Sequence, residues 1–341
     1  MRSKHIYRLL LVACVIVLFG SCQRGRQYFS KDVIPVELNI LRFDSALLTL
    51  PTDSAAMMSE IGELYKNYPV MMPVFAEDII GFDIGDTAGL CGALSHFLTD
   101  TLYGFAETNK REQELFADIS DIRLQLNKSF GKLLALYPDM HVPEIYFIVS
   151  GFNASLFFMD DDIVVGTDMY LGSDYPYYNR VVYEYQKKTM RKECVATDVM
   201  SVSLFRIIPY TSKQNRLLDN MIYRGKIMYL LSELMPEEKK WEVMGYTKEE
   251  WQWCERNERA IWRLMLDKQD LFKTETIVLT SYLNDGPFTS EISQESPSRL
   301  GTWMGWRIAE QYMLQNKDVT LQELMAEDDA QKILEGSHYR P

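Results

Sequence analysis

Histidine, a common general base and zinc ligand, is sparse after residue 22. The histidines of that part are His96, His141 and His338, and no two of them are close in the sequence. Without an HExxH motif or two histidines at helical spacing, a zinc hydrolase of the usual kind is excluded. The chain also has no GxSxG, no P-loop and no GxGxxG motif.

Two short motifs resemble a catalytic or a calcium-binding motif, but each has a simpler explanation. Ser129 and Lys132 form an S-x-x-K, as in penicillin-binding proteins, but the later Ser173-Asp174-Tyr175 lacks the Asn of the second box and Lys273-Thr274-Glu275 lacks the Gly of the third. We expect this pairing to be a coincidence within an amphipathic helix. The run Asp160-Asp161-Asp162 lacks the ligand spacing of a calcium loop, and it predicts a solvated hairpin tip.

Three cysteines follow residue 22, namely Cys91, Cys194 and Cys254, and they share no CxxC spacing. A zinc ribbon is therefore excluded. An odd number allows at most one internal disulfide. We predict three separate buried thiols, with one disulfide as the open alternative.

The N-terminus has the pattern of an export signal. Arg2, Lys4 and Arg8 precede an apolar run at residues 9–19, and Gly20-Ser21-Cys22 follows. The run is shorter than the roughly 20 residues that span a bilayer. Small residues before a cysteine resemble a bacterial lipoprotein signal, which predicts Cys22 as the acylated first residue of the mature protein. Two alternatives are an ordinary secretory signal and a weaker lipobox at Cys14.

The anchor predicts a location and a domain organisation. The residue directly after Cys22 is Gln23 and not Asp. We therefore expect an outer-membrane lipoprotein that faces the periplasm, held stably by two or more acyl chains. Residues 1–21 are the predicted signal peptide, residues 22–36 the anchor and tether, and residues 37–341 one domain. The chain has 36 basic and 48 acidic residues and a net charge of −12, which argues against nucleic acid as a partner.

The strongest strand signal lies within residues 141–172. Residues 145–149 are all β-branched or aromatic, and a second extended run covers residues 163–166. We predict that these runs pair antiparallel as a hairpin at about residues 144–166. Most other segments have helical periodicity, so the predicted class is α+β, mostly helical, with a small antiparallel sheet packed against helices. The predicted helices cover residues 44–50, 54–68, 94–103, 109–137, 178–188, 194–208, 216–233, 247–268, 301–314 and 321–334, and residues 69–93 are predicted to be a structured loop.

Four segments resemble one known family. They are PEIYFIVSGF, VVGTDMYLG, GYTKEEWQWCERNERAIW and SPSRLGTWMGWRIAEQYM, and they are similar to the gliding motility-associated lipoproteins of the GldB family over most of the mature chain. The resemblance implies an outer-membrane lipoprotein connected with the gliding machinery and its secretion system. The family pattern establishes no enzymatic activity.

A weaker resemblance is to gluzincin-type metallopeptidases that have lost their metal ligands. The order of a strand pair and two helices agrees with that fold, but Val195-Ala196-Thr197-Asp198-Val199 stands where HExxH would be, and Arg224 stands where the second helix would supply a Glu. This resemblance implies a degenerate zincin-like arrangement without metal.

Helical spacing places both Asp198 and Arg224 on apolar stripes, where unpaired charges are costly. We predict that they meet as an ion pair at the position of the lost metal. The alternative is that Arg224 extends to the surface while Asp198 binds a local backbone donor.

These observations give two functional hypotheses. The first is a non-catalytic, lipid-anchored protein that binds envelope proteins of unknown identity and needs no cofactor. The alternative is a periplasmic hydrolase of peptide or cell-wall substrates with an unrecognised site.

Overall fold

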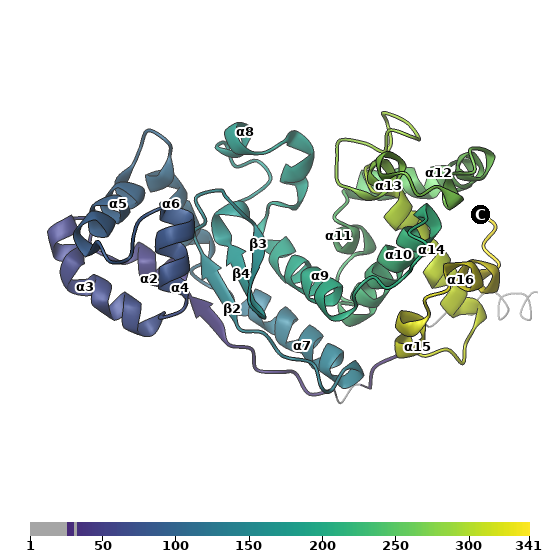
Figure 1. Cartoon of the computed structure of the whole chain (residues 1–341), viewed down its shortest axis with the longest axis horizontal. Helices are drawn as coiled ribbons and strands as arrows, with labels where there is room; N and C mark the ends of the chain where they lie inside the picture. The colour runs from purple at the N-terminus through teal and green to yellow at the C-terminus, as the bar shows by residue number, and fades with distance from the viewer. Residues whose placement is uncertain (1–25, 31–32) are drawn as a thin grey trace, which may run out of the picture. The chain divides into compact units, whose positions relative to one another are not determined.

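The computed structural model describes residues 26–30 and 33–341 (Figure 1). Val33–Pro341 forms one compact unit, distinct from Met1–Asp32. The predicted signal peptide and the predicted lipid site at Cys22 lie outside the described residues. None of the described helices is long and apolar enough to cross a bilayer.

A four-stranded mixed sheet lies in the middle of this unit. Its strands are β1 (Ile40–Arg42), β2 (Ile145–Ile148), β3 (Leu156–Met159) and β4 (Asp162–Gly166), in the spatial order β1-β2-β4-β3. The β1–β2 and β2–β4 pairs are parallel, whereas β3 and β4 pair antiparallel. The chain thus leaves β2, passes to the edge as β3 and returns beside β2 as β4.

The predicted antiparallel pairing of residues 145–149 with residues 163–166 is wrong. Ile145 pairs with Ile163 and Phe147 with Val165 in parallel register. The reason is an additional strand, β3, which the prediction does not include. The hairpin that forms joins β3 to β4 through Asp160, whose φ is 53°. Every residue of β2 is buried, as is typical of a parallel strand covered on both faces.

The N-terminal helices bury one face of the sheet. Tyr146, Ile148 and Val164 belong to the same hydrophobic cluster as Phe43, Phe75 and Phe97 of these helices. The rings of Phe43 and Phe75 lie 5.0 Å apart between centroids. The helices are α2 (Phe43–Leu48), α3 (Ser54–Asn67), α4 (Met71–Val74), a π-helix (Phe75–Ile80), α5 (Thr87–Thr99) and α6 (Phe105–Leu115).

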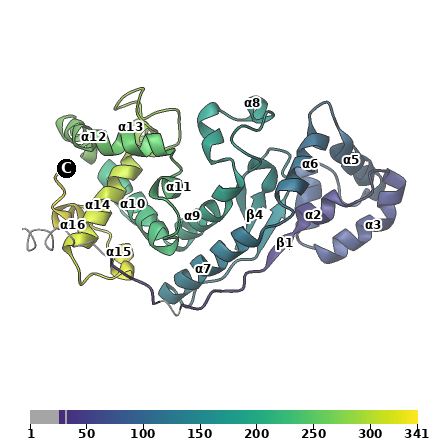
Figure 2. The same cartoon turned by 180° about the vertical axis from the view of Figure 1, so that it is seen from behind.

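The other face of the sheet contacts Phe116, the residue that follows α6. Phe147 meets Phe116 edge-on, with ring centroids 6.2 Å apart. Helix α7 (Ser120–Leu136) lies alongside the segment that leads into β1, as Figure 2 shows. The amide of Val36 donates to the carbonyl of Asn127 at 3.0 Å, so the end of the predicted tether packs against α7.

The C-terminal part of the chain is helical. Its 3₁₀ segments are Thr167–Met169, Glu184–Thr189, Lys192–Cys194 and Asp270–Phe272. Its α-helices are α8 (Tyr178–Val181), α9 (Val195–Ile207), α10 (Leu217–Leu234), α11 (Lys240–Met244), α12 (Lys248–Asp267), α13 (Thr276–Leu283), α14 (Leu300–Gln315), α15 (Leu321–Ala326) and α16 (Ala330–Ser337).

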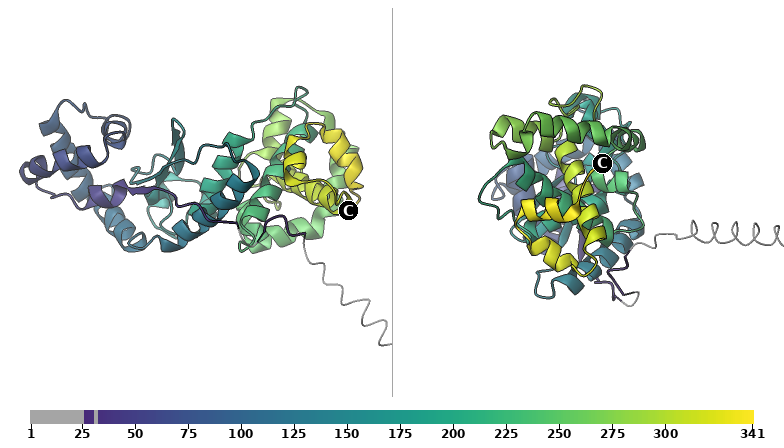
Figure 3. Two further views of the ribbon diagram at one scale, coloured as in Figure 1. Left: turned by 90° about the horizontal axis from the view of Figure 1, so that it is seen from below. Right: turned by 90° about the vertical axis from the view of Figure 1, so that its right-hand side faces the viewer.

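Helices α10 and α14 cross in direct backbone contact. A Cβ placed on Gly225 would lie 2.0 Å from the carbonyl carbon of Gly305, and one on Gly305 would lie 1.8 Å from the carbonyl oxygen of Met221. Only glycine fits at both positions, so these two residues permit the close approach of the helices. In Figure 3 the C-terminal helices, drawn in yellow, lie close together at one end of the Val33–Pro341 unit.

The predicted class, α+β and mostly helical, is confirmed, but several element boundaries differ from the prediction. The predicted helix at residues 178–188 is divided into α8 and the 3₁₀ segment Glu184–Thr189. Residues 69–93 are largely helical rather than loop. The predicted helix at residues 109–137 is interrupted between α6 and α7, and the predicted last helix is divided into α15 and α16. Aspartates supply caps or turns at both breaks, because Asp118 accepts from the amide of Ser120 and Asp329 from that of Gln331.

Candidate functional site

A cavity of about 220 Å³ lies between α9 and α10, and we call it the α9–α10 pocket. Lys188 and Thr189, the end of α11 and the start of α14 complete its wall. The ionisable side chains on the wall are Lys188, Asp198, Arg224, Asp285 and Arg299.

Asp198 lies in the first turn of α9 and is half-buried. The hydroxyl of Tyr170 donates to its Oδ2 at 3.0 Å. Burial raises the pKa of Asp198 to about 6, although the Tyr170 hydrogen bond and the positive charges of Arg299 and Arg191 oppose that rise. This carboxyl group therefore changes its charge near neutral pH.

Arg224 projects from α10 and is also half-buried. Its Nη1 donates to the carbonyl of Leu283 at 2.6 Å. Burial lowers the pKa of Arg224, and the nearby positive charge of Arg299 lowers it further. Among the ion pairs of the described residues, none involves Arg224.

Arg299 precedes α14 with a left-handed backbone, at a φ of 58°. Its Nη2 donates to the carbonyl of Met244 at 2.5 Å, and its Nε lies 3.9 Å from Oδ1 of Asp285, beyond hydrogen-bonding range. That Nε is buried and has no hydrogen-bond partner.

Two further side chains define the wall. Thr302, in the first turn of α14, is only 4% exposed, and its hydroxyl has no hydrogen-bond partner. Lys188 is neutralised by Glu250, whose two oxygens lie 2.8 and 3.0 Å from the ammonium group. The positive charges that remain on the pocket wall are therefore those of Arg224 and Arg299, opposite the carboxyl groups of Asp198 and Asp285.

The structure brings the predicted residues Asp198 and Arg224 to the same pocket, but within the described part of the chain no ion pair closer than 4 Å joins them. Asp198 is held by Tyr170 and Arg224 by the carbonyl of Leu283. The two charges thus face a shared space instead of neutralising each other directly.

The other predicted features have structural roles. Lys132 donates to the carbonyl of Leu234 at 2.8 Å, while Ser129 is buried in α7. Asp162 accepts from the amide of Glu144 at 2.9 Å, and Asp161 pairs with Arg206 at 3.0 Å. The Asp160–Asp162 run thereby forms the tip of the β3–β4 hairpin.

The three cysteines Cys91, Cys194 and Cys254 are buried and free, which confirms the prediction of separate thiols. Burial raises the pKa of Cys194, which precedes α9, to about 12, so its thiol is protonated at neutral pH. Within residues 26–30 and 33–341, no three His, Cys, Asp or Glu side chains are grouped so that they could hold a metal ion.

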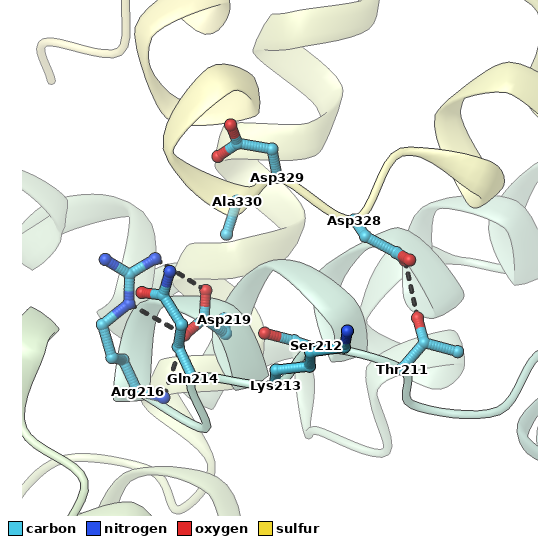
Figure 4. Close-up of a pocket in the computed structure, with 9 residues that line it drawn as sticks. All are labelled: Thr211, Ser212, Lys213, Gln214, Arg216, Asp219, Asp328, Asp329 and Ala330. Carbon is cyan, nitrogen blue, oxygen red and sulfur yellow. Dashed lines mark hydrogen bonds and ion pairs between the residues drawn. The ribbon is translucent and has the colours of Figure 1, made fainter.

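A second pocket, of about 350 Å³, lies at the start of α10 (Figure 4). Its carboxylates are held within the chain: Asp219 pairs with Arg216 at 2.9 Å, Asp328 accepts from Thr211 at 2.7 Å, and Asp329 caps α16. Because these groups already have partners, the α9–α10 pocket is the stronger candidate site.

Sequence reasoning missed Arg299 and Thr302. The segment Ser298-Arg299-Leu300 marked a helix start, but nothing in it indicates that the Arg299 backbone turns left-handed and returns the side chain towards α11. The signal that the sequence offers is a charge on an apolar helical stripe, and it points to Asp198 and Arg224 only.

The comparisons with known proteins agree with the resemblance described above. The family model described as "Gliding motility protein GldB" matches residues 25–341. No curated protein and no solved structure gives a significant match, so the gluzincin resemblance stays a prediction. Because the match covers nearly the whole chain, the protein belongs to the GldB family of gliding motility lipoproteins.

Proposed function

We propose that this protein is a non-catalytic lipoprotein of the outer membrane that faces the periplasm and binds another envelope protein through the α9–α10 pocket. Family membership supports the connection with gliding motility or its linked secretion machinery. The predicted lipid attachment at Cys22 supports the membrane location.

The observation that carries the proposal is the pair of guanidinium groups on the pocket wall, Arg224 and Arg299. A guanidinium keeps its proton at all physiological pH values, so it is a poor proton donor or acceptor in catalysis. It is well suited to recognition, because its planar fork binds carboxylates with defined geometry. A pocket with this chemistry favours binding over bond cleavage.

Affinity purification tests the partner-binding role. The full lipidated chain would be purified from detergent-solubilised membranes as wild type, as Arg224→Met and as Arg263→Met, and bound proteins identified by mass spectrometry. Arg263 is an exposed arginine on α12 and serves as the matched control. We expect a partner that is retained by wild type and Arg263→Met and reduced several-fold with Arg224→Met. The same partner in equal amounts with all three would refute the role of the pocket.

The anchor and the cellular role have separate tests. A fatty-acid analogue should label the wild-type protein in cells and leave Cys22→Ala unlabelled; equal labelling would reject Cys22 as the lipid site. Deletion should impair surface spreading or protein secretion, and no single Ser→Ala or His→Ala change should reproduce that loss at normal protein abundance.

One observation favours the alternative, a periplasmic hydrolase. The pKa of Asp198, about 6, suits a general base that works near neutral pH. Purified protein would be incubated with casein and with muropeptides. Cleavage by the wild type that is abolished in Asp198→Asn would replace the binding proposal with the hydrolase.

A further inference from the structure

We propose that the α9–α10 pocket recognises a carboxylate group of its partner, supplied by an acidic side chain or by a chain terminus. This inference rests on the proposed partner-binding role and names its chemistry. The ligand would lie between Arg224 and Arg299, with the hydroxyl of Thr302 as a third donor.

The first argument is the unused donor capacity of Arg224. A guanidinium carries five N–H donors, and within the described part of the chain Arg224 makes one hydrogen bond, from Nη1 to the carbonyl of Leu283. No carboxylate of the described chain lies within ion-pair distance of it. Such a side chain is held in place by the protein while its charge remains available to a ligand.

The second argument is the mutual repulsion of the two arginines. Arg299 contributes to the lowered pKa of Arg224, so the two like charges are close enough to interact. The Nε of Arg299 is also buried without a hydrogen bond. An anion between the two side chains would remove this repulsion and satisfy donors that have no acceptor in the chain.

The third argument is independent of the arginines. Thr302 lies on the pocket wall, is 4% exposed, and has a hydroxyl without a partner. Buried polar groups in native proteins nearly always have hydrogen-bond partners. Threonine occupies two χ1 rotamers in helices, so its hydroxyl can turn to a ligand in the pocket.

Size and charge narrow the ligand class. A cavity of about 220 Å³ accepts one side chain or one terminal residue, not a folded segment. Asp198 and Asp285 also line the pocket, and they repel a phosphate dianion more strongly than a singly charged carboxylate. The planar guanidinium fork matches a carboxylate bidentately.

Titrations of the full lipidated chain in detergent micelles, at pH 7.5 and constant ionic strength, test the inference. The probes are N-acetylglycine for a terminal carboxylate, N-acetylglutamate α-amide for a side-chain carboxylate, N-acetylglycinamide as the neutral analogue, and inorganic phosphate. We expect at least one carboxylate to bind about tenfold or more tightly than the amide, and phosphate to bind more weakly than that carboxylate. The tighter of the two carboxylates identifies the source.

Three variants separate recognition from folding. Arg224→Met should reduce carboxylate affinity about 10- to 100-fold, since it removes a charge-assisted contact, while Arg263→Met should leave it unchanged. Thr302→Val has nearly the same shape, removes an unpartnered hydroxyl and should fold normally, yet it should bind carboxylate several-fold more weakly.

The outcomes distinguish this inference from the proposed function. Equal affinity for carboxylate and amide, or tighter binding of phosphate, overturns the carboxylate assignment even if Arg224→Met loses a protein partner. Carboxylate binding that depends on Arg224 and Thr302 supports the assignment even if the purified partner is unaffected by the variants.

Discussion

Two regions of this protein contain carboxyl groups that are shielded from water, and the two regions differ in how the negative charge is compensated. At the start of α2, Asp44 is fully buried and receives the guanidinium fork of Arg42, with Nε–Oδ1 and Nη2–Oδ2 distances of 2.8 Å. Beside this pair lies Glu112, which is fully buried and whose carboxyl oxygens have no hydrogen-bond partner among the described residues. In the α9–α10 pocket, Asp198 and the guanidinium of Arg224 share a cavity without pairing.

This difference shows what distinguishes a charge that the fold neutralises from a charge that can bind a ligand. Burial, followed by the negative charge of Asp44, raises the pKa of Glu112 to about 9, so Glu112 is neutral in the folded protein at pH 7. The Arg42–Asp44–Glu112 group is therefore internally balanced and enclosed. In the pocket, Arg224 has no ion-pair partner among the described residues, and the Nε of Arg299 is 3.9 Å from the nearest Asp285 oxygen, which leaves a role for a ligand.

The largest expected effect is on the enclosed region. Arg42→Met removes the partner of Asp44 and leaves a buried negative charge next to Glu112. Breaking a buried ion pair in this way typically costs about 3–5 kcal/mol. Urea denaturation followed by tryptophan fluorescence would measure the free energy of unfolding. A loss below about 1 kcal/mol, as expected for the exposed control Arg263→Met, would show that the pair is not structural.

The next effect is a pH dependence of stability that Glu112 controls. Its pKa is about 9 in the fold against 4.5 in the unfolded chain, so the folded state binds the extra proton. The contribution of Glu112 to the free energy of unfolding is fully present below pH 4.5. It falls as the pH rises towards 9, by at most about 1.4 kcal/mol per pH unit. Glu112→Gln should flatten the fall between pH 5.5 and 7.5. Equal slopes in both proteins would contradict the assignment.

The smallest expected effect is a pH dependence of carboxylate binding in the α9–α10 pocket. Asp198 has a pKa of about 6, and Tyr170, Cys194, Arg191 and Arg299 are the titratable groups that act on it. Lowering the pH from 7.5 to 5.5 protonates Asp198 and makes the pocket more positive, whereas carboxylate ligands stay ionised above about pH 5. Carboxylate affinity should therefore rise about three- to tenfold.

The matched control for this pH effect is Asp198→Asn, which is neutral throughout that range. Its affinity should be high and independent of pH. A wild-type affinity that falls on acidification would mean that Asp198 assists the ligand instead of repelling it.

Periodicity was enough to predict the class and most helices, because amphipathic spacing such as that of α7 and the capping box of Thr247 and Glu250 are local signals. Sheet topology was predicted incorrectly. β3 is only four residues long and partly exposed, so its sequence Leu156–Met159 did not stand out from a loop. Without β3 between them in the sequence, β2 and β4 are inferred to pair antiparallel, whereas they pair in parallel.

The candidate site was predicted in part for a related reason. Asp198 and Arg224 were identifiable because a charge on an apolar stripe is unusual within one helix. Their partners were not, because Tyr170, Leu283 and Arg299 come from segments that only the tertiary fold brings near. The contribution of Arg299 depends on a left-handed residue that no helix propensity predicts.

The glycine crossing of α10 and α14 bears on how tightly the pocket can bind. Arg224 is next to Gly225, and Thr302 lies one turn before Gly305, so both donors sit beside the point where the two backbones touch. Backbone contact fixes that spacing more firmly than flexible side chains would. The pocket is therefore preorganised, and a ligand that enters it loses little binding free energy to ordering the walls.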